Sequence, residues 1–141
     1  MRSIVIKGAV DKHGHVTARL SHVHSLSRNE WEFRISSVVI TPVQGSLKSV
    51  VYELGCSLNN SECFNYSKNQ FMEKNTPLCL ISINTEKNVS QKIDLSQSVS
   101  PWLKLENVKD TVEISFYEPG TDIHPPKGLF STVMHMWIRR K

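Results

Sequence analysis

The chain has 141 residues, of which 39% are hydrophobic and 21% are charged, a balance that is ordinary for a globular protein and argues against disorder. The formal net charge of +4 is spread along the chain, and the only basic cluster is Arg139, Arg140 and Lys141. A nucleic-acid binder that works through phosphate neutralisation usually shows a basic stripe or a long basic arm, and neither is visible in the sequence. The length is close to the commonest size of one domain, so we predict a single domain over residues 1–141.

Cysteine usage indicates a reducing compartment. Cys56, Cys63 and Cys79 are odd in number, irregularly spaced and without a CxxC pair. The first ten residues show neither a long apolar stretch nor a small-residue cleavage site, and no apolar run approaches the roughly 20 residues that span a bilayer. We therefore expect an intracellular protein that does not insert into a membrane.

Hydrophobic residues alternate with polar ones along most of the chain, and this period of two predicts β-strands. The predicted strands, in chain order, cover residues 4–7, 15–20, 30–41, 47–58, 78–84, 89–95, 102–105, 111–117 and 129–140. A turn at residues 11–14 reverses the first strand. Residues 59–75 are rich in Asn, Ser and Lys, which predicts a long connection with one short strand or helical turn.

The third and last predicted strands are the strongest. In the third, Trp31, Phe33 and Ile35 share one face, and an interruption at Ser36 and Ser37 predicts a bulge or a change of facing. The last strand carries apolar residues on both faces, which predicts a central position in its sheet or a neighbouring subunit above it. Nine or ten short strands without a long helix favour an antiparallel β-sandwich, and an eight-stranded jelly roll with an extra N-terminal hairpin fits best.

Histidine pairs are the strongest hint of a metal. His13 and His15, and likewise His22 and His24, are spaced i, i+2, which places both imidazoles of a pair on one face of a strand. Asp11, Asp122 and His124 can supply further ligands. The alternative is that these are solvated polar positions around a hairpin edge. Spacing alone is weak evidence, so we predict no metal and no cofactor.

Signatures of catalysis are scarce. The sequence has no GxSxG elbow, no phosphate-cradling glycine loop and no cysteine in a recognisable catalytic context. A nucleophile pair such as Cys56 with His135 requires a tertiary contact that sequence does not show. We therefore expect a protein that is not an enzyme.

Several residues are candidate contacts with a ligand or a second subunit. Trp102 follows a proline near a strand start and is the tryptophan expected to be exposed. The loop at residues 118–128 contains three prolines, and a rigid loop suits docking at low entropic cost, although a purely structural loop is equally compatible. The predicted contacts are Trp102, His124, Pro125, Pro126, Trp137, Arg139 and Arg140.

Three segments, EWEFRISSVVITP, PLCLISIN and GLFSTVMHMWIRRK, resemble the single jelly-roll penton or minor capsid proteins of Polinton-like and adintovirus-like elements. The resemblance lies in pattern and length. It implies a virion protein that assembles inside the host cell as a homo-oligomer, a pentamer at the capsid vertices, beside a neighbouring capsid protein. It also implies a basic C-terminus that makes weak contact with nucleic acid. The alternative function is a monomeric β-sandwich module that binds a glycan or a peptide through Trp102 and the histidine-rich hairpin.

Overall fold

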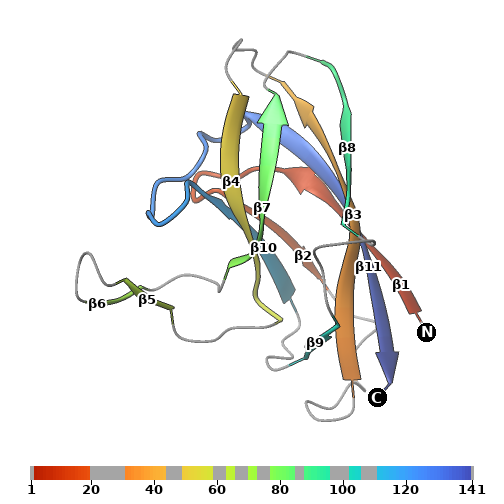
Figure 1. Cartoon of the computed structure of the whole chain (residues 1–141). Helices are drawn as coiled ribbons and strands as arrows, with labels where there is room; N and C mark the ends of the chain where they lie inside the picture. The colour runs from red at the N-terminus through yellow and green to blue at the C-terminus, as the bar shows by residue number, and fades with distance from the viewer. Residues whose placement is uncertain are drawn as a thin grey trace.

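The computed structural model describes residues 2–19, 31–43, 49–58, 63–65, 70–72, 77–84, 88–95, 102–105 and 111–140. Within these ranges the secondary structure consists of strands (Figure 1). The strands are β1 (Arg2–Ala9), β2 (His15–Arg19), β3 (Trp31–Pro42), β4 (Ser49–Cys56), β5 (Cys63–Asn65), β6 (Gln70–Met72), β7 (Pro77–Asn84), β8 (Gln91–Asp94), β9 (Leu103–Lys104), β10 (Thr111–Tyr117) and β11 (Phe130–Arg140). In this part of the chain, no helix is long and apolar enough to cross a membrane.

Two antiparallel sheets face each other and form the sandwich (Figure 1). One sheet, hereafter the terminal sheet, has the order β1-β11-β3-β8. The short strand β9 pairs with the start of β3, at Glu32 and Phe33. The other, hereafter the inner-strand sheet, has the order β2-β10-β4-β7. Along the chain, successive strands of these eight lie in opposite sheets, except β4 and β7, which pair in one sheet, and this is the connectivity of a jelly roll. The predicted fold class is therefore confirmed.

One detail of the fold prediction was wrong. The first two strands are not an extra hairpin but belong to the eight strands of the jelly roll. β1 pairs with β11 from Arg2↔Ile138 to Ala9↔Ser131, while β2 pairs with β10 in the opposite sheet. The turn between β1 and β2 is therefore a crossover between the sheets, and the apolar faces of both strands belong to the same core.

The predicted bulge is present in β3. His135 of β11 pairs with Ser37 and Met136 pairs with Ile35, so Ser36 is the extra residue. Ser36 uses its groups locally: its hydroxyl donates to the carbonyl of His135 at 3.2 Å, and its carbonyl accepts the N–H of Leu95 at 2.8 Å. Because of the extra residue, odd-numbered positions face the core before the bulge and even-numbered ones after it. The buried residues of β3 are accordingly Phe33 and Ile35, then Val38 and Ile40.

The core lies between the sheets and is filled by alternate residues of each strand. In β11, the inward positions are all buried: Phe130, Thr132, Met134, Met136 and Ile138. β11 lies between β1 and β3, which confirms its predicted central position. Phe116 of β10 meets Phe130 edge-on, with ring centroids 5.0 Å apart, so the aromatic contact joins the two sheets.

The described parts of four connections lie at the end of the sandwich away from the two termini (Figure 1). They are residues 10–14 between β1 and β2, residue 43 after β3, residues 88–90 before β8 and residues 118–129 between β10 and β11. Hydrogen bonds join them: Asn88 N–H donates to the carbonyl of Pro42 and Val43 N–H to that of Leu129, each at 2.8 Å. We call this the loop end. The segment predicted as one long connection contains the short pair β5 and β6 in its described part.

Candidate interaction surface

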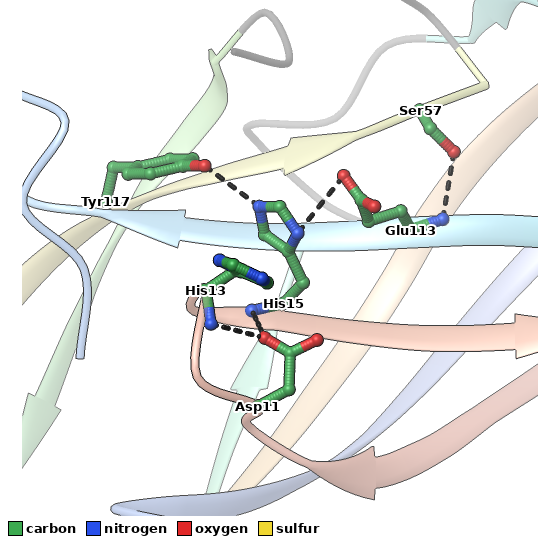
Figure 2. A network of polar contacts seen from close by, with 6 residues as sticks. All are labelled: Asp11, His13, His15, Ser57, Glu113 and Tyr117. Carbon is green, nitrogen blue, oxygen red and sulfur yellow. Dashed lines mark hydrogen bonds and ion pairs between the residues drawn. The ribbon is translucent and has the colours of Figure 1, made fainter. Parts of the chain in front are cut away.

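A polar network on the outer face of the inner-strand sheet supports the loop end (Figure 2). His15 of β2 pairs with Ser115 of β10, so Glu113 and Tyr117 lie one step to either side on the same face. The His15 ring joins both: Nδ1 lies 3.3 Å from Glu113 Oε1, and Nε2 lies 2.8 Å from the Tyr117 hydroxyl. The imidazole therefore links two positions of β10 to the first residue of β2.

The Tyr117 hydroxyl is held as a neutral phenol in this network. Burial raises the pKa of Tyr117, and the negative charges of Glu113, Asp11 and Asp122 raise it further. The phenol therefore keeps its proton, and it shares a hydrogen bond with Nε2 of His15 in which the donor depends on the tautomer of the imidazole. The arrangement is chemically suited to holding strands in place.

Asp11 holds the turn between β1 and β2. Its Oδ1 accepts the backbone N–H groups of His13, at 2.8 Å, and of His15, at 3.0 Å. Burial acts to raise the pKa of the Asp11 carboxyl, but these two hydrogen bonds and the nearby imidazoles outweigh it and leave the pKa below the usual value. An aspartate that accepts local N–H groups is a common way to fix a tight turn.

The turn touches the β10–β11 connection at Gly14. Its carbonyl accepts the N–H of Phe116 at 3.0 Å, and its φ of 74° lies in the left-handed region. A Cβ at this position would lie 2.4 Å from the Cβ of His124. The two backbones therefore approach as closely as they do because residue 14 has no side chain.

The β10–β11 connection, residues 118–128, is ordered by hydrogen bonds within it and by one to β4. Glu118 N–H donates to the carbonyl of Ile123 at 2.8 Å, and Gly120 N–H donates to Glu53 Oε1 at 2.9 Å. Among the predicted contacts in this loop, Pro125 is buried, His124 is half-buried and Pro126 is exposed. The loop presents Ile123, whose side chain is 53% exposed, on a fixed backbone.

Two further apolar side chains are exposed at the loop end. Val43, at the end of β3, is 47% exposed, and Val89, at the start of the segment into β8, is 44% exposed. The hydrogen bond between Asn88 and Pro42 places their backbones side by side. Sequence reasoning missed both valines, because a single valine beside a turn carries no signal until the fold brings the turns together.

The other predicted contacts lie elsewhere. Trp102 is half-buried, and the Arg139 guanidinium lies 3.8 Å from the centre of its ring. Arg139 Nε is also 2.5 Å from Glu32 Oε1, so this cation is already engaged on both sides. Arg140 is exposed at the end of β11, and Trp137 is 39% exposed on the outer face of the terminal sheet. The structure therefore divides the predicted set among three regions.

Within the described ranges, the candidates for metal binding and nucleophilic chemistry are not assembled into a site. The His13 and His15 rings lie 6.2 Å apart, but no group of three His, Cys, Asp or Glu residues able to hold a metal occurs among the described residues. His22 and His24 lie outside the described residues.

The cysteine–histidine pair considered from the sequence is not formed. Cys56 is fully buried in the core, and burial raises its thiol pKa to about 12. His135 is exposed on the outer face of the other sheet. The two side chains therefore belong to opposite environments of the sandwich.

No known protein family and no curated protein matches this chain. Among solved structures, the chain is similar to a protein in the cryo-EM structure of the extra small virus (XSV) VLP of the giant freshwater prawn Macrobrachium rosenbergii. The sequences are 9% identical, the match covers 96% of this chain and 77% of the other, and the TM-score is 0.30. At this level the overlap carries no weight for function, which has to be argued from the residues of this chain.

Proposed function

We propose that the protein is a self-assembling structural subunit of a viral capsid, which closes into a cyclic oligomer, a pentamer, at the capsid vertices. The jelly roll is a scaffold that viral capsid proteins share with lectin domains and cupins, so the fold supports this proposal without excluding other functions. The proposal places the protein in the virion, in contact with a neighbouring capsid protein, and gives it no catalytic role.

The observation that carries the proposal is the loop end. Val43, Val89 and Ile123 are exposed there on connections that hydrogen bonds hold in place. Apolar side chains on an ordered backbone favour association, because their burial gains hydrophobic free energy while little conformational entropy is lost. The polar network of His15 and the contact at Gly14 supply that order, so they serve assembly in this proposal.

The binding-module alternative has less support. It depends chiefly on Trp102 as an exposed stacking surface for a glycan or peptide. Arg139 covers one face of that ring, and a ligand would have to displace a guanidinium that is also paired with Glu32. Thiol catalysis by Cys56 or Cys79 is disfavoured, since burial raises the thiol pKa of Cys56 to about 12 and of Cys79 to about 11.

Solution mass, measured by light scattering during size exclusion at several protein and salt concentrations, tests the proposal. A pentamer near five times 16.1 kDa is expected. We expect Ile123→Asp to dissociate it, because a carboxylate would be desolvated in the contact. The matched control is Leu80→Asp, which alters a side chain of similar exposure (59%) on β7 and leaves the mass unchanged.

Each result has a defined meaning. A monomer at every concentration contradicts self-assembly and favours the alternative function, a monomeric module that binds a glycan or a peptide. An oligomer that Leu80→Asp dissociates and Ile123→Asp does not would retain self-assembly but contradict the loop end as the contact. Electron microscopy of the sample then reports whether the oligomer is a closed ring of five, as proposed.

A further inference from the structure

We propose that the outer face of the terminal sheet binds single-stranded nucleic acid. This goes beyond assembly at the loop end and does not depend on it. The face is built by the outward positions of β1, β11, β3, β8 and β9. Their alternate neighbours fill the core, so the period of two decides which side chains point outward.

An exposed tryptophan lies on this face, near the end of the sheet where β1 and β3 begin and β11 ends. Trp137 is 39% exposed and belongs to β11, which has β1 on one side and β3 on the other. Its direct partners are Ser3 of β1 and Arg34 of β3. Val5, 53% exposed, is the diagonal neighbour of Trp137 on β1, since it pairs with His135. An exposed aromatic side chain is therefore bordered by a small residue, a cationic one and Val5.

The charge around Trp137 is positive. The cationic side chains of the face are Lys7, Arg34, Lys92, Lys104 and Arg139. The anionic ones are Glu32 and Asp94, of which Glu32 is paired with Arg139. Arg34 pairs directly with Trp137 and places a guanidinium beside it, although its Nε is itself buried and has no hydrogen-bond partner among the described residues.

The opposite face has the opposite sign. On the outer face of the inner-strand sheet the charged positions are Glu53, Glu113 and Arg19. The adjoining loops add the anions Asp11, Glu118 and Asp122 and the cations Lys12 and Lys127, so anions are in excess. A polyanion that approaches the protein is therefore repelled from one face and attracted to the other. This charge complementarity selects the terminal sheet.

A nucleic acid strand fits the face better than a second copy does. Exposed large apolar side chains on this face are limited, among the described residues, to Trp137 and Val5, and interface cores are depleted in lysine. The same positive face on two copies would repel itself in a symmetric contact. A stacking aromatic ring among cations is the arrangement that binds single strands, whose bases are free to stack, unlike those of a duplex.

Fluorescence anisotropy with a labelled oligothymidylate of about twenty nucleotides, titrated at about 50 to 200 mM salt, tests the proposal. We expect Trp137→Ala to weaken binding by about 5- to 150-fold through loss of base stacking. Lys7→Gln and Lys92→Gln are each expected to reduce the slope of log K against log salt by about 0.7. Arg19→Gln, which removes an exposed cation from the opposite face, is the control and should change neither quantity.

Three results would overturn the proposal. One is no binding by the unaltered protein at the lowest salt. The second is loss of binding in Arg19→Gln or Arg140→Gln that equals the loss in Trp137→Ala, since nonspecific charge or the chain end would then explain it. The third is a change in solution mass with Trp137→Ala and no change in oligonucleotide affinity, which would make the face a contact between copies. Urea unfolding of each variant verifies that it is folded. If Trp137→Ala does not fold, the salt dependence of binding in Lys7→Gln and Lys92→Gln still tests whether the face binds the oligonucleotide.

Discussion

Replacement of Gly14 by alanine tests the contact that joins the β1–β2 turn to the β10–β11 connection. Residue 14 has a φ of 74°, where an L-residue costs about 1–2 kcal/mol. The new Cβ would also lie 2.4 Å from the Cβ of His124 and 3.1 Å from the carbonyl oxygen of Phe116. Both Cβ atoms are fixed to backbone, so one of the two loops has to move.

The expected cost has two parts. The left-handed φ contributes about 1–2 kcal/mol, and overpacking of a tight contact contributes about a further 1–3 kcal/mol, so Gly14→Ala should lower the free energy of unfolding by about 2–5 kcal/mol. Gly120→Ala is the matched control. Gly120 has a φ of 71°, but a Cβ there meets nothing within 4 Å, so only the first part applies.

Urea denaturation at one protein concentration measures both variants by linear extrapolation. The double variant Gly14→Ala/His124→Gly removes the Cβ that causes the clash, and the cycle should show that the second change recovers part of the loss. Equal losses for Gly14→Ala and Gly120→Ala, with no coupling between residues 14 and 124, would refute the close contact.

Three further outcomes follow from the structure. Asp11→Ala should lower the free energy of unfolding by about 1 kcal/mol in the same urea assay, and Asp11→Asn by less, because the amide oxygen still accepts the two N–H groups. The pKa of Asp11 is lowered on folding, so its charge stabilises the protein at neutral pH, and we expect this part to be lost as pH falls below about 4. Cys56 should resist iodoacetamide at pH 8 until urea unfolds the chain, as mass spectrometry of the labelled peptides would report, since burial raises its thiol pKa to about 12. Arg139→Ala should lower the free energy of unfolding by about 1 kcal/mol in the same urea assay, because it removes the contacts with Trp102 and Glu32 at a half-exposed position. An unchanged free energy of unfolding would contradict a stabilising role for these two contacts.

Local patterns in the sequence were sufficient for much of the fold. Alternation of apolar and polar residues predicted the strands, since successive side chains point to opposite faces whatever the partner strand is. The interruption at Ser36 and Ser37 predicted the bulge in β3, because a change of parity is visible along one strand. The apolar character of both faces of β11 predicted its central position.

The candidate surface was only partly visible before the fold was known. The proline-rich loop at residues 118–128 marked one component, and three of the predicted contacts, His124, Pro125 and Pro126, lie in it. Trp102 was expected to be exposed, but the structure places it under Arg139. The cation–π contact between Trp102 and Arg139 joins residues far apart in the sequence, so no local sequence pattern predicts it.

Pairing between distant strands decided what the sequence alone could not. His15 and Tyr117 are 102 positions apart, and they meet because β2 pairs with β10 in the register His15↔Ser115. The same holds for Trp137 beside Arg34 on the terminal sheet. The sequence by itself determined which residues are strand and which face of each strand is apolar, because those depend on neighbours in the chain. Tertiary structure decided which faces and turns lie together, because only burial of all eight strands at once selects their order.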